Sequence, residues 1–181
     1  MEYVAITMRY MLGVVFLVSS VSKLSRPGDF HKFLDMLRRT GLLNARLSKP
    51  VGVVIVSAET VVALLLVTPT RITSVLGAAL AVGLLATFTV ALWIVLHRGA
   101  EIECHCFGAS RAALGRRHVV RNASLTLVAL VAGVAELSAT HPSTLPEAGV
   151  VALAGALCGL VVTRLDDIFT IFAPIEGSPR G

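Results

Sequence analysis

The sequence predicts an all-α membrane protein, a polytopic bundle of four to five transmembrane helices with one interfacial amphipathic helix. Of the 181 residues, 55% are hydrophobic and only 15% are charged, which is far from the balance of an ordinary soluble domain. The apolar residues stand in long uninterrupted blocks without the alternation of strands. Basic residues exceed acidic ones by only 16 to 11, with few aromatics among them, so the predicted partner is the lipid bilayer and no nucleic acid.

Five apolar blocks follow one another, each near the roughly 20 residues that a spanning helix needs. They cover residues 4–21, 51–67, 72–97, 119–139 and 148–163. The third has no Asp, Glu, Lys or Arg, whereas the fourth has a short uncharged core, and the count is four if that block does not span. The first lacks a basic leader and a cleavage site, and is expected to be a retained helix. We expect one membrane domain over 1–172, with an extra C-terminal helix at about 145–165 and a short tail at 173–181.

The connection between the first two blocks has the pattern of an amphipathic helix. Apolar residues recur at helical spacing, Asp29 precedes them, and Gly41 is placed to end the helix. The apolar positions are Phe30, Phe33, Leu34 and Leu37, and the basic ones are Lys32, Arg38 and Arg39. Such a helix is predicted to lie in the interface plane with its basic residues among the headgroups. A connector without a specific ligand is the simpler interpretation, since anionic lipid satisfies the basic face.

The basic residues also predict the orientation in the membrane. With five spans, the connections at 23–49 and 98–121 and the C-terminal tail share one side, which holds fourteen of the 16 Lys and Arg residues. Only Arg9 and Arg71 fall on the other side. By the positive-inside rule, the N-terminus of this multi-pass protein of the cell membrane lies outside and both basic connections lie in the cytoplasm.

The predicted chemistry lies in the second basic connection, where Cys104 and Cys106 flank His105. A Cys-X-Cys pair can close into a small strained ring, and strained disulfides are the labile, more oxidising ones. We therefore predict Cys104 and Cys106 as the catalytic dithiol. Two alternatives stay open: the two thiolates together with His105 or His118 are soft ligands for zinc or copper(I), and the segment can be an inert tight turn.

The remaining unusual residues lie in the apolar blocks. Glu59 stands in the middle of its block, where a charge is costly, so it must be protonated, paired or exposed to an internal cavity. One interpretation is a proton or ligand site; the other is a packing contact with Ser, Thr or Arg9 of a neighbouring helix. Cys158 stands in a small-residue pattern and is predicted to be a buried apolar side chain outside the site. Helix-end or interface anchoring is the simpler role for a further set: Arg9, Trp93, His97 and Arg121.

Several of these residues together resemble the methylamine-utilisation MauE family, within the wider DoxX-like group of small membrane proteins. The resemblance covers about 4–140 and rests on Ser22-Lys23-Leu24, the Phe-rich amphipathic segment, Glu59, Cys104-His105-Cys106-Phe107-Gly108 and Arg121-Asn122. Members often have Gly where this chain has His105. The resemblance implies a redox-associated helper, as in the maturation of methylamine dehydrogenase, that works beside a thioredoxin-like partner. Cys104 and Cys106 carry over as a dithiol, while Lys23 and Glu59 match the motif without an assigned role.

The distribution of basic residues and the family resemblance conflict on the side of the membrane where Cys104 and Cys106 lie. The basic residues predict the cytoplasm, whereas disulfides of secreted proteins form outside it. Either the basic connections lie partly along the membrane, or the pair passes electrons across it, or the protein is not an oxidase. Two functions stay open: a thiol-disulfide redox protein or an accessory to one, and a noncatalytic or metal-handling membrane subunit. The client protein is unknown. No residue pattern indicates a cofactor, and a quinone is compatible with a membrane redox protein but unsupported by the sequence.

Overall fold

The computed structural model describes residues 2–98, 116–138 and 145–172. Within these ranges the chain forms helices and no strands. In chain order they are α1 (Glu2–Leu24), α2 (Asp29–Arg39), α3 (Ala45–Val67), α4 (Arg71–His97), α5 (Arg116–Ser138) and α6 (Leu145–Phe172). The predicted all-α fold is confirmed.

Within the part of the chain that the structure describes, four helices are long and apolar enough to cross a membrane. They are α1 from Tyr3 onward, α3, α4 and α5. The fourth predicted block is thus one of the four, although its uncharged core is short. Helix α6 contains a shorter apolar stretch, Gly149–Arg164. The chain is therefore a multi-pass membrane protein, within the predicted range of spans.

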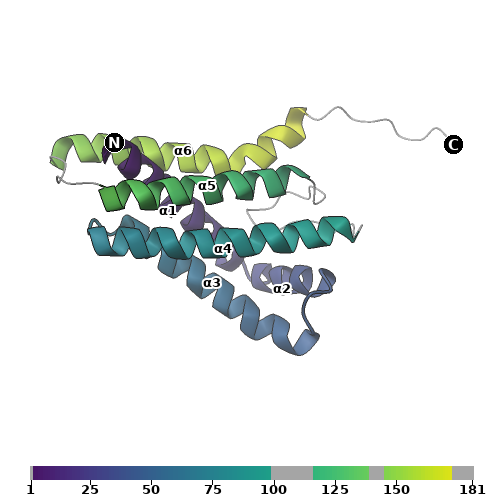
Figure 1. The fold of residues 1–181 in the computed structure, drawn as a ribbon. Helices are drawn as coiled ribbons and strands as arrows, with labels where there is room; N and C mark the ends of the chain where they lie inside the picture. The colour runs from purple at the N-terminus through teal and green to yellow at the C-terminus, as the bar shows by residue number, and fades with distance from the viewer. Residues whose placement is uncertain (1, 99–115, 139–144, 173–181) are drawn as a thin grey trace.

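Helix α1 lies at the centre of the bundle and packs against α3, α5 and α6, while α4 packs against α3 and α5. Figure 1 shows α4 and α5 lying side by side with α1 behind them, whereas α3 diverges toward its N-terminal end, where α2 lies. Apolar side chains of four helices form the core: Leu12, Val15 and Phe16 of α1, Val62, Ala63 and Leu66 of α3, Ala81 and Leu85 of α4, and Leu125, Ala129 and Ala132 of α5.

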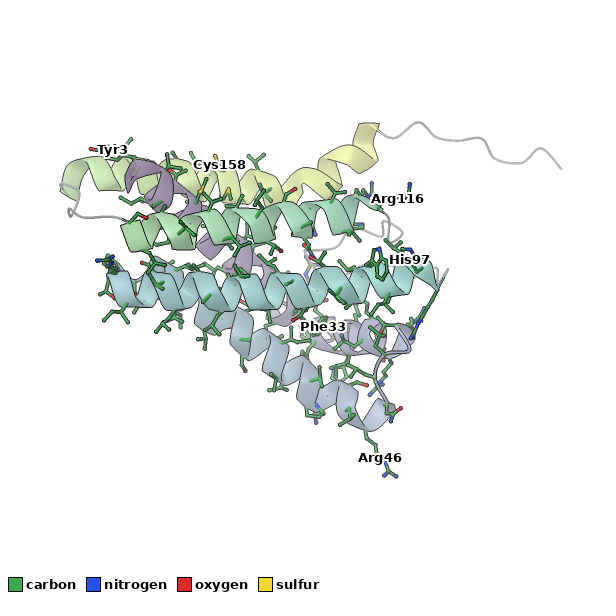
Figure 2. The ribbon with its side chains drawn as sticks, viewed as in Figure 1. Tyr3, Phe33, Arg46, His97, Arg116 and Cys158 are labelled. Carbon is green, nitrogen blue, oxygen red and sulfur yellow. The ribbon has the colours of Figure 1, made fainter. Side chains whose placement is uncertain are left out.

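Glycines let α6 approach the backbone of α1 closely. A Cβ at Gly159 would lie 2.7 Å from the carbonyl oxygen of Met11, and one at Gly155 would meet the carbonyl oxygen of Thr7. This is the close helix contact that small residues at i and i+4 allow in membranes. Because the two glycines take the face toward α1, Cys158 falls beside that face and is exposed (Figure 2). The prediction that Cys158 is buried is wrong.

The predicted amphipathic helix is confirmed as α2, and the protein itself covers part of its apolar face. Phe33 and Leu34 are buried. Gly52 of α3 provides the space, since a Cβ there would lie 2.5 Å from Cδ2 of Leu34. Glycines with positive φ flank the helix: Gly28 at 100° and Gly41 at 66°. Both turns use conformations that residues with a Cβ rarely adopt.

Candidate functional site

A buried cluster of polar side chains joins α1 to α3. The Lys23 Nζ donates to both carboxylate oxygens of Glu59, at 2.8 Å each, and to the Ser19 Oγ at 2.7 Å. Ser19 Oγ in turn donates to Glu59 Oε1 at 3.0 Å. Ser19 and Lys23 are one helical turn apart on α1, so both side chains reach the same carboxylate.

This Ser19–Lys23–Glu59 cluster is sealed from its surroundings. The Lys23 and Glu59 side chains are 2% and 1% exposed. Above the ammonium, the ring of Phe33 in α2 lies with its centroid 5.2 Å from Nζ, within the range of a cation–π contact. Three elements therefore enclose one ion pair. Neither charge of a buried pair can be removed alone without leaving the other uncompensated, although the pair as a whole adds little net stability.

The cluster lies at the C-terminal end of α1. Glu59 stands near the middle of α3, but its partner Lys23 is the penultimate residue of α1. Since α3 diverges from the bundle and extends past the end of α1, the middle of α3 lies level with that end (Figure 1). Of the two interpretations of Glu59, the interhelix contact is present, through Ser19 and Lys23 in place of Arg9.

Arg9 belongs to a second buried polar cluster nearer the opposite end of α1. Its Nη1 donates to Ser74 Oγ of α4 at 2.8 Å and lies 3.4 Å from Glu136 Oε1 of α5. Arg9 is 8% exposed. The prediction that it is a helix-end or interface anchor is therefore wrong, because it links three helices inside the bundle. Opposite charges on separate apolar helices were the only sequence signal for this pairing.

Further polar residues gather at the start of α5. His118 and Asn122, one turn apart, are each 3% exposed, and Arg121 between them is half-buried. The Oδ1 of Asn122 has no hydrogen-bond partner in the part of the chain that the structure describes. On α4, the rings of Trp93 and His97 pack at a centroid distance of 4.1 Å. The sequence prediction named Arg121 as a site candidate and Asn122 as part of the family motif, without predicting that His118 and Asn122 are buried.

The predicted dithiol falls between α4 and α5. Cys104, His105 and Cys106 lie outside the described residues. The helix ends that flank their connection, marked by His97 and Arg116, lie at the same end of the bundle in Figure 2. Within the described ranges, no three His, Cys, Asp or Glu side chains come together as a metal site requires.

The fold and these clusters define a class: a small polytopic helical membrane protein with ion pairs buried between its helices and a Cys-X-Cys connection. The chain belongs to the MauE family, since the family model described as "Methylamine utilisation protein MauE" matches residues 1–135. The match covers α1 to α4 and most of α5, whereas α6 lies beyond it. Comparison with curated proteins and with solved structures gave no match. The family links this membrane protein to methylamine utilisation.

Proposed function

We propose that this chain supports thiol-disulfide exchange, and thereby the maturation of a partner protein, through Cys104 and Cys106. One observation carries the proposal: two of the three cysteines stand a single residue apart, between α4 and α5 of a MauE-family chain. A disulfide closed over one intervening residue is strained, and strained disulfides exchange readily. Family membership supports a client in methylamine utilisation, as in the maturation of methylamine dehydrogenase.

The proposed exchange takes place with a thioredoxin-like dithiol partner. A thiolate of the partner attacks one sulfur of the Cys104–Cys106 disulfide, a mixed disulfide forms, and the other cysteine leaves as a thiolate. The second thiolate of the partner then attacks the mixed disulfide. The partner leaves as a disulfide, and Cys104 and Cys106 remain as a dithiol. Two electrons pass in this direction or the reverse, according to the reduction potentials of the two pairs.

The proposed orientation has the N-terminus outside and the Cys104–Cys106 connection in the cytoplasm. Support comes from the connections 23–49 and 98–121, which lie on the same side if α3 and α4 both cross the membrane and which together hold twelve of the 16 Lys and Arg residues. In a Cys158→Ser background, a membrane-impermeant maleimide should label this connection only after the cells are permeabilised and reduced. Labelling of intact cells would place the connection outside and contradict the orientation.

Cysteine replacement tests the exchange itself. Because the mixed disulfide must be resolved by the second thiol, Cys104→Ser, Cys106→Ser and the double variant should lose client maturation equally. The single variant that lacks the resolving cysteine should accumulate a covalent adduct with the partner, which a reductant releases. Cys158→Ser, exposed on α6, is the matched control and should mature the client normally.

Two outcomes would contradict the proposal. One is normal client maturation in the double variant. The other is zinc or copper that co-purifies with the native chain and is lost in both single variants without any trapped adduct. The second outcome would establish the metal-handling function, since thiolates bind both metals.

A further inference from the structure

Helix α2 covers the Ser19–Lys23–Glu59 cluster with apolar side chains. Phe33 and Leu34 provide the buried contact with α1 and α3, with Phe33 over the Lys23 ammonium. The charged side chains of α2 pair within the helix itself. Lys32 Nζ lies 2.9 Å from Asp29 Oδ1, and Arg38 Nη1 lies 3.2 Å from Asp35 Oδ1. These ion pairs would move with α2.

Lipid can replace the apolar contacts that hold α2. Lipid chains are as apolar as leucine, so no hydrophobic driving force holds an apolar side chain on a protein surface inside a bilayer. An amphipathic helix with a basic polar face also binds stably at an anionic membrane interface. Helix α2 has both faces: Phe30, Phe33, Leu34 and Leu37 on one, and exposed Lys32, Arg38 and Arg39 on the other. It therefore has two favourable positions, on α3 and in the interface.

The connections of α2 permit movement between these positions. Gly28 and Gly41 stand at its two ends with φ of 100° and 66°, and no atom lies within 4 Å of where a Cβ would be at either residue. Hinges are a few such terminal residues that absorb a change in backbone angles. Leu34 rests against Gly52, a residue without a side chain that could interlock with it. Rotation at both ends would lift α2 without unfolding it.

We propose that α2 is a lid that moves between α3 and the lipid interface, and that its opening gives water and small polar solutes access to the Lys23–Glu59 pair. When α2 is closed, Phe33 and Leu34 exclude solvent from the pair. When it is open, the charges face the headgroup layer, where water solvates them at far lower cost than acyl chains would. The lid does not involve Cys104 or Cys106, and the site that it gates is the charged pair between α1 and α3.

A water-soluble carbodiimide tests this access chemically. The reagent activates the Glu59 carboxyl, the amine of Lys23 displaces a urea, and an amide joins the two side chains with the loss of one water from the protein mass. With the pair closed, the 2% and 1% exposed side chains are out of reach. Lys32 and Asp29 provide an internal control, because their 2.9 Å pair has a 62% exposed lysine and stays accessible whether or not α2 is lifted.

The experiment uses the full-length chain in nanodiscs, with Cys104, Cys106 and Cys158 replaced by Ser. Leu34→Cys with Gly52→Cys forms a disulfide that locks α2 closed, and Leu34→Cys also removes the methyl group that the new Cβ would meet. We expect the Lys23–Glu59 amide to form at least about tenfold more slowly when the lock is oxidised, a difference of about 1.4 kcal/mol. Reduction should restore the rate, and the Lys32–Asp29 amide should form equally in both states.

A second variant keeps the test decisive if the lock does not close. Leu34→Ala removes the side chain seated on Gly52 and should accelerate formation of the Lys23–Glu59 amide severalfold. Leu42→Ala, at an exposed leucine beyond α2, should leave the rate unchanged. Equal Lys23–Glu59 rates in the locked and reduced protein, or in Leu34→Ala and the parent, would overturn the lid. So would the absence of this amide where the Lys32–Asp29 amide forms. Every such result leaves the dithiol proposal unaffected.

Discussion

Removing one charge of the Lys23–Glu59 pair should destabilise the protein much more than removing both. Among the described residues, Lys23→Met leaves the Glu59 carboxylate with one hydrogen-bond donor, Ser19 Oγ, in a place where the glutamate side chain is 1% exposed. Glu59→Leu leaves the Lys23 ammonium with the Oγ and carbonyl oxygen of Ser19 and the ring of Phe33. The lysine thus keeps more of its partners than the glutamate does.

The magnitudes follow from this difference. Breaking a buried ion pair by removing one partner costs about 3–5 kcal/mol, because the other charge remains buried. We expect Lys23→Met at the upper end of this range and Glu59→Leu at the lower end. The double variant Lys23→Met/Glu59→Leu replaces the pair with apolar side chains of similar volume, and its stability should lie within about 1 kcal/mol of the native protein.

Equilibrium unfolding of the purified chain in mixed micelles, driven by a denaturing detergent, measures these free energies. The Lys32→Met variant is the matched control, since that lysine is 62% exposed and should change stability by less than about 0.5 kcal/mol. If the double variant were as unstable as either single variant, the electrostatic explanation would be refuted, and shape alone would account for the loss.

Three further tests, two of them with a control variant, address the rest of the bundle. Arg9→Leu should lower the free energy of unfolding by about 2–4 kcal/mol, because α1 loses its polar contacts with Ser74 and Glu136. Ser74→Ala should lower it by only about 1 kcal/mol. Equal losses in the two variants would contradict a buried ion pair. Gly159→Leu should lower stability by at least about 1–3 kcal/mol, because the new side chain would collide with the backbone of Met11. Gly83→Ala, where a Cβ meets no other atom, should be neutral or stabilising. Thermal unfolding of both variants would show whether α6 packs on α1 as described. Cys158→Ser should leave the melting temperature within error, and a clear drop would mean that this side chain is buried.

The helices were predictable because their cause is local. An apolar block of spanning length needs a hydrogen-bonded backbone in lipid, so block length and composition alone indicate α1, α3, α4 and α5. Periodicity likewise indicates α2 from Phe30, Phe33, Leu34 and Leu37. The protein surface that covers this apolar face was not predictable, because it depends on a missing side chain at Gly52, which lies on another helix.

Partners of the buried charges depend on tilt and register, which single-helix patterns do not contain. The sequence indicated that Glu59 needs a partner and allowed Ser as one, but the divergence of α3 decides that the partners are Ser19 and Lys23. The packing of α1 against α5 likewise brings Arg9 close to Glu136. Residue type alone predicts that Cys158 is buried. Because Gly155 and Gly159 occupy the face of α6 that packs on α1, the Cys158 side chain is exposed instead.

The most direct test of the proposed function counts free thiols at controlled redox potential. The full-length protein in nanodiscs is equilibrated with glutathione buffers, alkylated with a maleimide and weighed intact. The chain has three cysteines, so full reduction gives three labels. We predict that oxidation removes two labels together with a single midpoint potential, and that Cys158 keeps the last one, because Cys104 and Cys106 close one disulfide. Three labels at every potential would contradict a Cys104–Cys106 dithiol and with it the exchange function.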